Sequence, residues 1–530
     1  MWDTIRHMAR LATVARTLAR YDALAPHELA RHLPTGVRVA GRLARAWPGK
    51  NAHLDAAARP GERLCLALQS LGPAFIKLGQ FLATRPDIIG DALAGDLKSL
   101  QDRLPPFSTA RAKAILTAEL ERPWEELYTS FSAPVAAASI AQVHQAQTRP
   151  LSDEVAGAKV VAVKVLRPGI EKDFAKDMAA LAFAARIAER WRPALRRLEP
   201  VKLVETLAAS SEMEMDLRLE AAAASELAEN NRGRQNFRVP AVDWTRTSQR
   251  VLTSEWIDGT PITDAASLSA QGLDPARIAR HVIEAFLTHA LQDGFFHADM
   301  HQGNIFVDRH GCLTVVDFGI MGRLDPPSRR YLAEILLGFL TRDYTRLAEV
   351  HFDAGYVPSH QSRQLFAQSL RAVGEPIFGR QAGAISMARL LAQLFQVTAT
   401  FDMHLQPQLL LLQKTMMVVE GVARDLDPDL NIWDISRPLI EQWMTEHFGP
   451  QAQIRHAAEN ALAASRALSH LPAALEWAQN ASEVFTPEGL RLHPDATRAM
   501  ARAAHHRRSV TAALWVGAAA LVVIALSAVL

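Results

Sequence analysis

The stretch that decides the fold is His297-Ala298-Asp299-Met300-His301-Gln302-Gly303-Asn304, followed downstream by Val315-Val316-Asp317-Phe318-Gly319. Asp299 and Asn304 have the spacing of a phosphotransferase catalytic loop, in which the carboxylate positions the nucleophile and the amide oxygen binds a metal ion. The second stretch is a buried strand that ends in an aspartate beside a glycine, which suits chelation of Mg²⁺. We therefore expect Asp299 to be the catalytic base or water-positioning group, and Asn304 and Asp317 to be metal ligands.

The two histidines of this loop raise the alternative of a zinc site. His297 and His301 could form a metal-binding pair, but no third soft ligand lies near them in the sequence. The chain has only two cysteines, Cys65 and Cys312, so neither a cysteine-rich zinc site nor a disulfide framework is available. The sequence therefore favours a hard metal ion with oxygen ligands, in a protein from a reducing compartment.

A lysine upstream completes the order expected of a phosphotransferase. Lys164 ends the apolar run Val161-Ala162-Val163-Lys164, and a strand-borne lysine can hold its ammonium over nucleotide phosphates. Taken alone, such a lysine is most often an exposed strand end. The chain has 10 lysines and 48 arginines, so each lysine carries more information than usual. With Asp299, Asn304 and Asp317 in the right order, the joint pattern predicts nucleotide chemistry.

Hydrophobic periodicity and turn signals predict an α+β protein. Strands are expected over 131–143, 159–166 and 250–256, and a hairpin around Gly311 joins 304–307 to 313–316. Helices are expected over 54–121, 173–192 and 201–230, and they dominate after Pro275.

Overall composition excludes several classes of protein, and the amino-terminal segment departs from the average. The chain has 530 residues, is 49% hydrophobic and has a net charge of +2, which argues against a disordered chain or a nucleic-acid binder. The first fifty residues hold nine Lys/Arg and three Asp/Glu, a net of +6. Their arginines recur at helical spacing, so this segment is either a solvated basic helix or a contact with anionic membrane lipid.

The carboxyl-terminal segment predicts a membrane anchor. Residues 509–530 carry no charge, and 22 helical residues span about 33 Å, enough to cross a bilayer core. Arg507 and Arg508 precede this segment, and basic residues stay cytoplasmic, so the main body should face the cytoplasm. The alternative is a buried helix or hairpin of the core. A lone terminal anchor without a transit peptide favours a bacterial inner membrane.

A family resemblance becomes visible around Phe75-Ile76-Lys77-Leu78-Gly79-Gln80, Thr84-Arg85-Pro86-Asp87 and Leu100-Gln101-Asp102-Arg103-Leu104-Pro105-Pro106. Together with the catalytic loop, these motifs resemble the UbiB-type atypical protein-kinase-like family of ubiquinone biosynthesis, over essentially the whole length. The Lys-x-Gly-Gln signature of that family matches Lys77, Gly79 and Gln80. Read without the family, Lys77 would be a surface lysine beside a glycine packing site.

The resemblance implies an alanine-rich phosphate loop in place of the glycine-rich loop of ordinary kinases. The matching stretch is Val135-Ala136-Ala137-Ala138-Ser139-Ile140-Ala141-Gln142-Val143. Alanine resists the positive φ angles that glycine adopts, so this loop should be stiffer and should bind nucleotides selectively. Without the surrounding motifs it would be read as an alanine-rich strand and turn of the core.

Further residues acquire roles from the same resemblance. Glu214 and Asp216 match a Glu-x-Asp motif that meets the Lys-x-Gly-Gln helix as a regulatory element, and Glu220 matches the helix glutamate that pairs with Lys164. The backbone of Glu255 and Ile257 matches the hinge that binds adenine. Three positions depart from the family pattern: Ala223 replaces an asparagine, and Met300 and Gln302 replace prolines.

The implied architecture is a bilobal protein-kinase-like fold with an amino-terminal helical extension, a helical insert and a carboxyl-terminal transmembrane helix. The expected parts are 1–120 (extension), 121–260 (N-lobe with insert), 261–450 (C-lobe), 451–508 (helical linker) and 509–530 (anchor). No Ala-Pro-Glu segment follows Gly319, so a peptide-docking platform is not expected.

The resemblance further implies ATP and Mg²⁺ as cofactors, and a membrane-anchored ATPase that gives access to quinone-precursor lipids. Other ubiquinone biosynthesis proteins are the candidate protein partners. A small-molecule phosphotransferase and an ATP-binding pseudokinase scaffold remain alternatives. The oligomeric state is left open.

Overall fold

The structure is a computed structural model that describes residues 2–23, 59–83, 89–97, 100, 104–150, 157–191, 196, 199–378, 393–394, 397, 400–403, 406–449, 485–486 and 489–490. The chain divides into two compact units, Met1–Trp443 and Met444–Leu530. The described part of the second unit contains a short antiparallel hairpin, β11 (Phe485–Thr486) with β12 (Gly489–Leu490).

The first sheet is antiparallel and has the strand order β1-β2-β3-β5. Its strands are β1 (Tyr128–Ala137), β2 (Ala141–Thr148), β3 (Val160–Leu166) and β5 (Val251–Glu255). Alternate valines of β3 are buried against Leu116 and Leu127, which come from α8 (Thr109–Glu119) and α9 (Trp124–Leu127). Because side chains alternate along a strand, Lys164 projects from the opposite face of the sheet.

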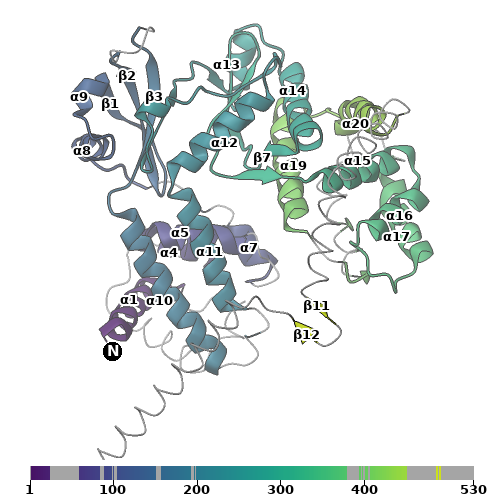
Figure 1. Ribbon diagram of the computed structural model, residues 1–530, viewed down its shortest axis with the longest axis horizontal. Coiled ribbons are helices and arrows are strands. Elements are labelled where there is room, and N and C mark those ends of the chain that lie inside the picture. Colours follow the sequence, from purple (N-terminus) through teal and green to yellow (C-terminus); the bar gives the residue numbers. More distant parts are fainter. Residues whose placement is uncertain are drawn as a thin grey trace, which may run out of the picture. The chain divides into compact units, whose positions relative to one another are not determined.

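Helices cover that opposite face. α12 (Leu217–Asn230) follows the helical insert, α10 (Ile170–Trp191) and α11 (Pro200–Glu214), which run side by side in Figure 1. The amino-terminal extension packs on the insert through α1 (Trp2–Arg20) and α5 (Pro73–Ala83), and α4 (Pro60–Leu71) and α7 (Asp91–Leu97) pack on those helices. Arg10 of α1 donates to Asp177 of α10 over 2.8 Å, so part of the basic amino-terminal charge serves to hold this extension in place.

The helix predicted over 201–230 is interrupted. The chain leaves α11 at Glu214 and starts α12 at Leu217, because Asp216 caps the new helix by accepting from the Arg218 N–H at 3.1 Å. This break lets α12 approach the sheet independently of α11.

A second sheet has the order β4-β9-β8-β6 and adjoins the predicted catalytic loop, 297–304. Its strands are β4 (Phe237–Arg238), β6 (Thr260–Pro261), β8 (Ile305–Val307) and β9 (Leu313–Val315), and β8 and β9 form the predicted hairpin. A separate antiparallel pair consists of β7 (Phe295–His297) and β10 (Met321–Arg323). β7 comes before this loop in the sequence, and β10 comes after it. β4 precedes β5 in the chain, yet it pairs with β9, so residues before and after position 260 share this sheet.

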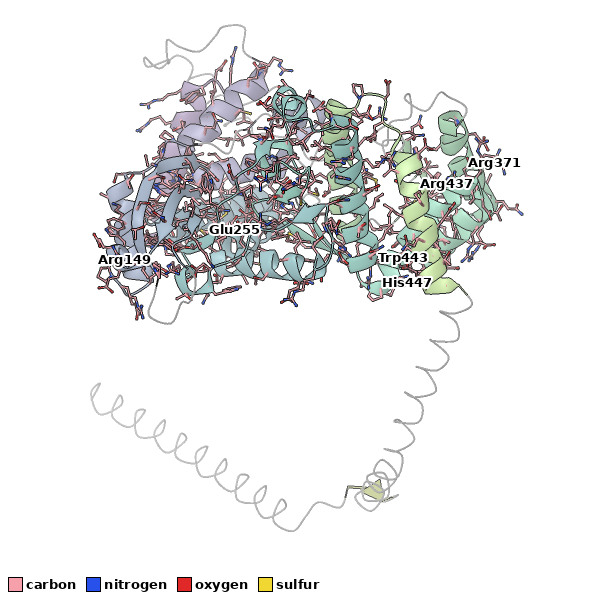
Figure 2. All side chains as sticks on the ribbon, turned by 90° about the horizontal axis from the view of Figure 1, so that it is seen from above. Arg149, Glu255, Arg371, Arg437, Trp443 and His447 are labelled. Atoms are coloured by element: carbon pink, nitrogen blue, oxygen red, sulfur yellow. The ribbon has the colours of Figure 1, made fainter. Side chains whose placement is uncertain are left out.

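Helices dominate the rest of the described chain, as the sequence predicted for the part after Pro275. They are α13 (Ala265–Ala270), α14 (Pro275–Thr288), α15 (Pro326–Thr341), α16 (Tyr344–Asp353), α17 (Arg363–Phe378), α19 (Pro407–Leu426) and α20 (Ile432–Phe448). α19 packs along α14 and reaches β10, which brings it to the predicted catalytic loop (Figure 1). Figure 2 labels Glu255 at the end of β5, between Arg149 beyond β2 and Arg371 on α17.

Several predictions fall on residues outside the described part of the chain. They include Thr84-Arg85-Pro86-Asp87, Gln101-Asp102-Arg103, most of 451–508 and the predicted anchor at 509–530. Among the helices that the structure does describe, none is both long and apolar enough to span a membrane.

Candidate active site

An ion cluster of three residues, from a strand, a helix and the loop after β9, forms the centre of the candidate site. Lys164 of β3 donates from Nζ to both carboxylate oxygens of Glu220 on α12, at 2.8 and 2.9 Å. The same ammonium lies 3.3 Å from Oδ1 of Asp317. The Lys164 and Glu220 side chains are 18% and 8% exposed, whereas Asp317 is 52% exposed. The cluster therefore presents one carboxylate to solvent and keeps the other buried as a support for the lysine.

The charges of this cluster stabilise one another. The Lys164 ammonium lowers the pKa of Asp317 to about 2. Burial by itself would lower the pKa of Lys164, but the negative charges of Asp317 and Glu220 outweigh it and raise that pKa above its usual value. Burial raises the pKa of Glu220, against the opposing effect of Lys164. Lys164 and Asp317 are therefore both charged at neutral pH.

The backbone of Asp317 is held in an unusual conformation. Its φ angle is +64°, a left-handed value that costs energy for a residue other than glycine. Oδ1 of Asp317 accepts from the Gly319 N–H at 3.3 Å, and Glu220 accepts from the backbone of Phe318. Strain that persists beside an ion cluster is typical of a functional site, and here it directs the aspartate toward Lys164.

The predicted catalytic loop is organised around a buried histidine. Nδ1 of His297 accepts from the Asp299 N–H at 3.1 Å, and Nε2 lies 3.4 Å from the carbonyl of Val316. Burial lowers the pKa of His297, so the ring is neutral and links Asp299 to the strand end before Asp317. Both ring nitrogens of His297 therefore contact other groups of the protein.

The β8–β9 hairpin places the predicted metal ligands on one edge. The Val316 N–H donates to the carbonyl of Asn304 at 2.9 Å, and the Asn304 amide donates to the carbonyl of Asp299 at 3.1 Å. Asn304 and Asp317 therefore lie at neighbouring register positions. Their amide and carboxylate oxygens are hard donors of the kind that Mg²⁺ prefers, and they fit a metal ion whose other ligands are phosphate oxygens. Among the described residues, no three His, Cys, Asp or Glu side chains cluster as a metal site.

Asp299 is flanked by two basic side chains. Nε2 of His301 lies 3.8 Å from Oδ2, and Nζ of Lys414, on α19, lies 3.9 Å from Oδ1. Nδ1 of His301 accepts from the Gly303 N–H at 3.0 Å, which places the proton of the neutral ring on Nε2, toward Asp299. The Asp299 carboxylate is 33% exposed and is open to a reacting group.

The alanine-rich segment forms the end of β1, a turn and the start of β2. An arginine that the sequence reading did not single out holds this turn: the guanidinium of Arg167 donates to the Ala138 carbonyl at 2.8 Å and to Pro105 and Leu104 carbonyls at 3.0 and 3.2 Å. Gln142, fully buried, exchanges hydrogen bonds with the backbone of Phe107. The predicted phosphate loop is therefore tied to the segment that enters from the amino-terminal extension.

The predicted hinge follows β5. The Glu255 N–H donates to the carbonyl of Ala241 at 2.8 Å, and its carboxylate pairs with Arg238. Ile257 lies just beyond the strand and is half-buried. Since the Glu255 N–H is already used within the protein, adenine binding would depend on its carbonyl and on the backbone of Ile257.

The Lys-x-Gly-Gln helix contacts the candidate site through the insert. Nζ of Lys77 on α5 lies 2.6 Å from Oε2 of Glu214, and both side chains are mostly buried. A Cβ on Gly79 would lie 2.6 Å from Leu100 and 2.7 Å from Leu68, so glycine allows the close packing of this helix. The other motif residues have different roles: Asp216 pairs with Arg218 and caps α12, and Gln80 is half-buried.

The Lys77–Glu214 pair connects α5 to the end of α11, just before α12, which carries Glu220. We expect Lys77→Met to lower the free energy of unfolding by about 2 kcal/mol, because it leaves Glu214 without its partner. The charge-reversed variant Lys77→Glu/Glu214→Lys should regain about half of that loss in urea denaturation. Lys202→Met, which removes a lysine from an exposed pair with Glu199, is the control and should change stability little. If the stability lost in the reversed variant equals the sum of the losses in Lys77→Glu and Glu214→Lys, the two residues are not coupled.

Comparison with known protein families identifies the class of domain that contains this site. Residues 99–351 match the ABC1 atypical kinase-like domain, and residues 370–431 match the UbiB helical domain. The chain therefore contains a kinase-like bilobal fold of mixed helices and sheets, of the atypical class.

Curated relatives narrow the class to one family. A protein of Marinobacter nauticus named "Probable protein kinase UbiB" is 43% identical over 400 residues, which are 74% of this chain and 72% of the relative. Proteins of the same name from Pseudomonas putida strain W619 and Azotobacter vinelandii are 43% and 40% identical, and the latter match covers 85% of this chain and 82% of the relative. This chain belongs to the UbiB family.

A solved structure also matches the chain. It is the complex of Rv3197 with erythromycin from Mycobacterium tuberculosis, which is 23% identical, has a TM-score of 0.49 and covers 77% of this chain and 98% of that chain.

Proposed function

We propose that this protein is an atypical kinase-like ATPase that supports ubiquinone biosynthesis. The single observation that carries the proposal is the cluster of Lys164, Glu220 and Asp317. Asp317 follows the β8–β9 hairpin, and Asn304 and Asp299 lie beside it through backbone and amide hydrogen bonds. Membership of the UbiB family supports the link to ubiquinone. Bound MgATP would supply the electrophilic γ-phosphoryl group and a metal ion that offsets its charge.

Each residue of the site would have a separate role in ATP binding and hydrolysis. Lys164, held by Glu220, would bind the α- and β-phosphates, and Asp317 and Asn304 would hold Mg²⁺. Asp299 would orient a water molecule and accept its proton while the water oxygen bonds to the γ-phosphorus. The bond between that phosphorus and the bridging oxygen breaks, and ADP leaves with the electron pair. Lys77 and its helix would regulate the site through Glu214.

The membrane part of the proposal has two supports. The predicted anchor at 509–530 is uncharged, and α1 exposes Ile5 and Met8, both 55% exposed, next to Arg6. A helix with exposed apolar and basic side chains favours anionic lipid surfaces, where hydrophobic quinone precursors also reside. We propose that the catalytic body faces the cytoplasm at a bacterial inner membrane and that ATP hydrolysis gives access to such precursors.

The test is ATP hydrolysis by the purified full-length protein, with and without cardiolipin-containing vesicles, together with the quinone content of a deletion strain. We expect Asp299→Asn to reduce the hydrolysis rate by about 100-fold and to fail to restore quinone. Full restoration of quinone by Asp299→Asn would favour a scaffold that needs no turnover. Transfer of label from γ-labelled ATP to a metabolite rather than to phosphate would favour a small-molecule phosphotransferase.

A further inference from the structure

Helix α19 brings a lysine to the catalytic aspartate from a part of the chain outside the ABC1 domain match. Nζ of Lys414 lies 3.9 Å from Oδ1 of Asp299, and its side chain is 48% exposed. Lys414 lies within the residues that match the UbiB helical domain. A cation so close to the proton acceptor lies where negative charge develops on a transferring phosphoryl group.

The position of Lys414 is fixed by the residues around it. Oγ1 of Thr415, fully buried, donates to the carbonyl of Ala298 at 3.0 Å, directly beside Asp299. Almost three turns further along α19, Asp425 accepts from Gln302 of the catalytic loop. Because the helix is attached to the loop on both sides of Asp299, the lysine stem starts from a defined place.

Lys414 is not held in a close structural ion pair. A direct charge-assisted hydrogen bond is about 2.7–2.9 Å long, and the 3.9 Å separation from Asp299 is well outside that range. Within the described residues, no other carboxylate lies within ion-pair distance of Lys414. The ammonium can therefore turn toward an anionic ligand without breaking a stabilising contact.

The composition of the chain makes this lysine conspicuous. Residues 203–530 contain a single lysine, Lys414, although arginine supplies the cations elsewhere in that region. A lysine ammonium is a compact point charge on a flexible stem, which suits a small, mobile phosphoryl group better than the broad fork of arginine does.

We propose that Lys414 is a catalytic residue of the helical domain whose ammonium contacts the γ-phosphoryl group and stabilises its charge during transfer. The inference rests on the proposed ATPase function. Lys414 exchanges no proton and forms no bond: it lowers the energy of the transition state while Asp299 accepts the proton. The helical domain is then part of the catalytic machinery.

The first test is steady-state ATP hydrolysis by the full-length protein. We expect Lys414→Met to lower kcat by about 100-fold and to change KM for MgATP by less than about threefold, since the contact forms in the transition state. Lys414→Arg keeps the charge, and its kcat should be about tenfold higher than that of Lys414→Met. Lys202→Met, which removes a lysine that is 73% exposed on α11, is the charge-matched control and should keep the wild-type rate.

The second test reads binding rather than turnover. MgADP with aluminium fluoride, a mimic of the transferring phosphoryl group, should raise the Tm of the wild-type protein above its value with MgADP alone. Lys414→Met should keep the shift with MgADP and lose the additional shift with aluminium fluoride. A wild-type kcat or a wild-type fluoride shift in Lys414→Met would overturn the inference while leaving the ATPase proposal intact. A wild-type protein that neither binds nor hydrolyses MgATP would overturn both.

Discussion

Replacing Asp317 by Asn is expected to reduce ATP hydrolysis by about 1,000-fold, the largest effect on activity that the structure predicts. The substitution removes the exposed carboxylate of the ion cluster, which is the charge available to Mg²⁺. Asparagine tolerates positive φ better than most residues, so the +64° conformation should survive and the variant should fold. The measurement is the hydrolysis rate as a function of Mg²⁺ concentration, in which the variant should need far more metal or should not saturate.

The pH dependence of stability gives this variant an internal control. Lys164 lowers the pKa of Asp317 to about 2, below the usual value of about 3.9, so the ionised form contributes stability above pH 4. That contribution is lost as the pH falls from about 4 toward 2. The difference in unfolding free energy between wild type and Asp317→Asn should therefore shrink as the pH falls below 4. A difference that stays the same below pH 4 would contradict the assigned Lys164–Asp317 contact.

Local motifs made the centre of the site predictable from the sequence. The β3 strand, the β8–β9 hairpin and the spacing of Asp299, Asn304 and Asp317 all lie within short stretches whose side-chain alternation or turn chemistry can be read directly. The Lys164–Glu220 contact spans 56 residues, and only the family resemblance indicated it. The resemblance likewise indicated Lys77 and Glu214, which pattern alone would have left as surface charges.

Contacts between distant elements were not predictable, because sequence patterns do not encode which surfaces meet. Arg167 reaches Leu104 across 63 positions, and Thr415 reaches Ala298 across 117. Lys414 had a compositional signal, as a lone lysine in an arginine-rich region, but its target depends on how α19 packs on α14. The break before α12 did have a local signal, since an aspartate such as Asp216 is a favoured helix cap.

Replacing Lys164 by Met is expected to have the largest effect on stability, because it leaves the buried carboxylate of Glu220 without its cation. Breaking a buried ion pair from one side costs about 3 kcal/mol at neutral pH. The double variant Lys164→Met/Glu220→Gln removes both charges and keeps an oxygen that can accept from the backbone of Phe318. It should recover to within about 1 kcal/mol of the wild type in urea denaturation, although both variants should lack ATP hydrolysis.

The pH dependence of the single variant separates this explanation from a simple packing defect. Burial already raises the pKa of Glu220, and loss of the opposing Lys164 charge raises it further. A raised pKa gives stability that is present at low pH and is lost as the pH rises through the folded-state value. The deficit of Lys164→Met should therefore be smaller at pH 5.5 than at pH 8, whereas the double variant should show no such change. A deficit that is equal at both pH values would mean that the lysine stem, rather than its charge, supports α12.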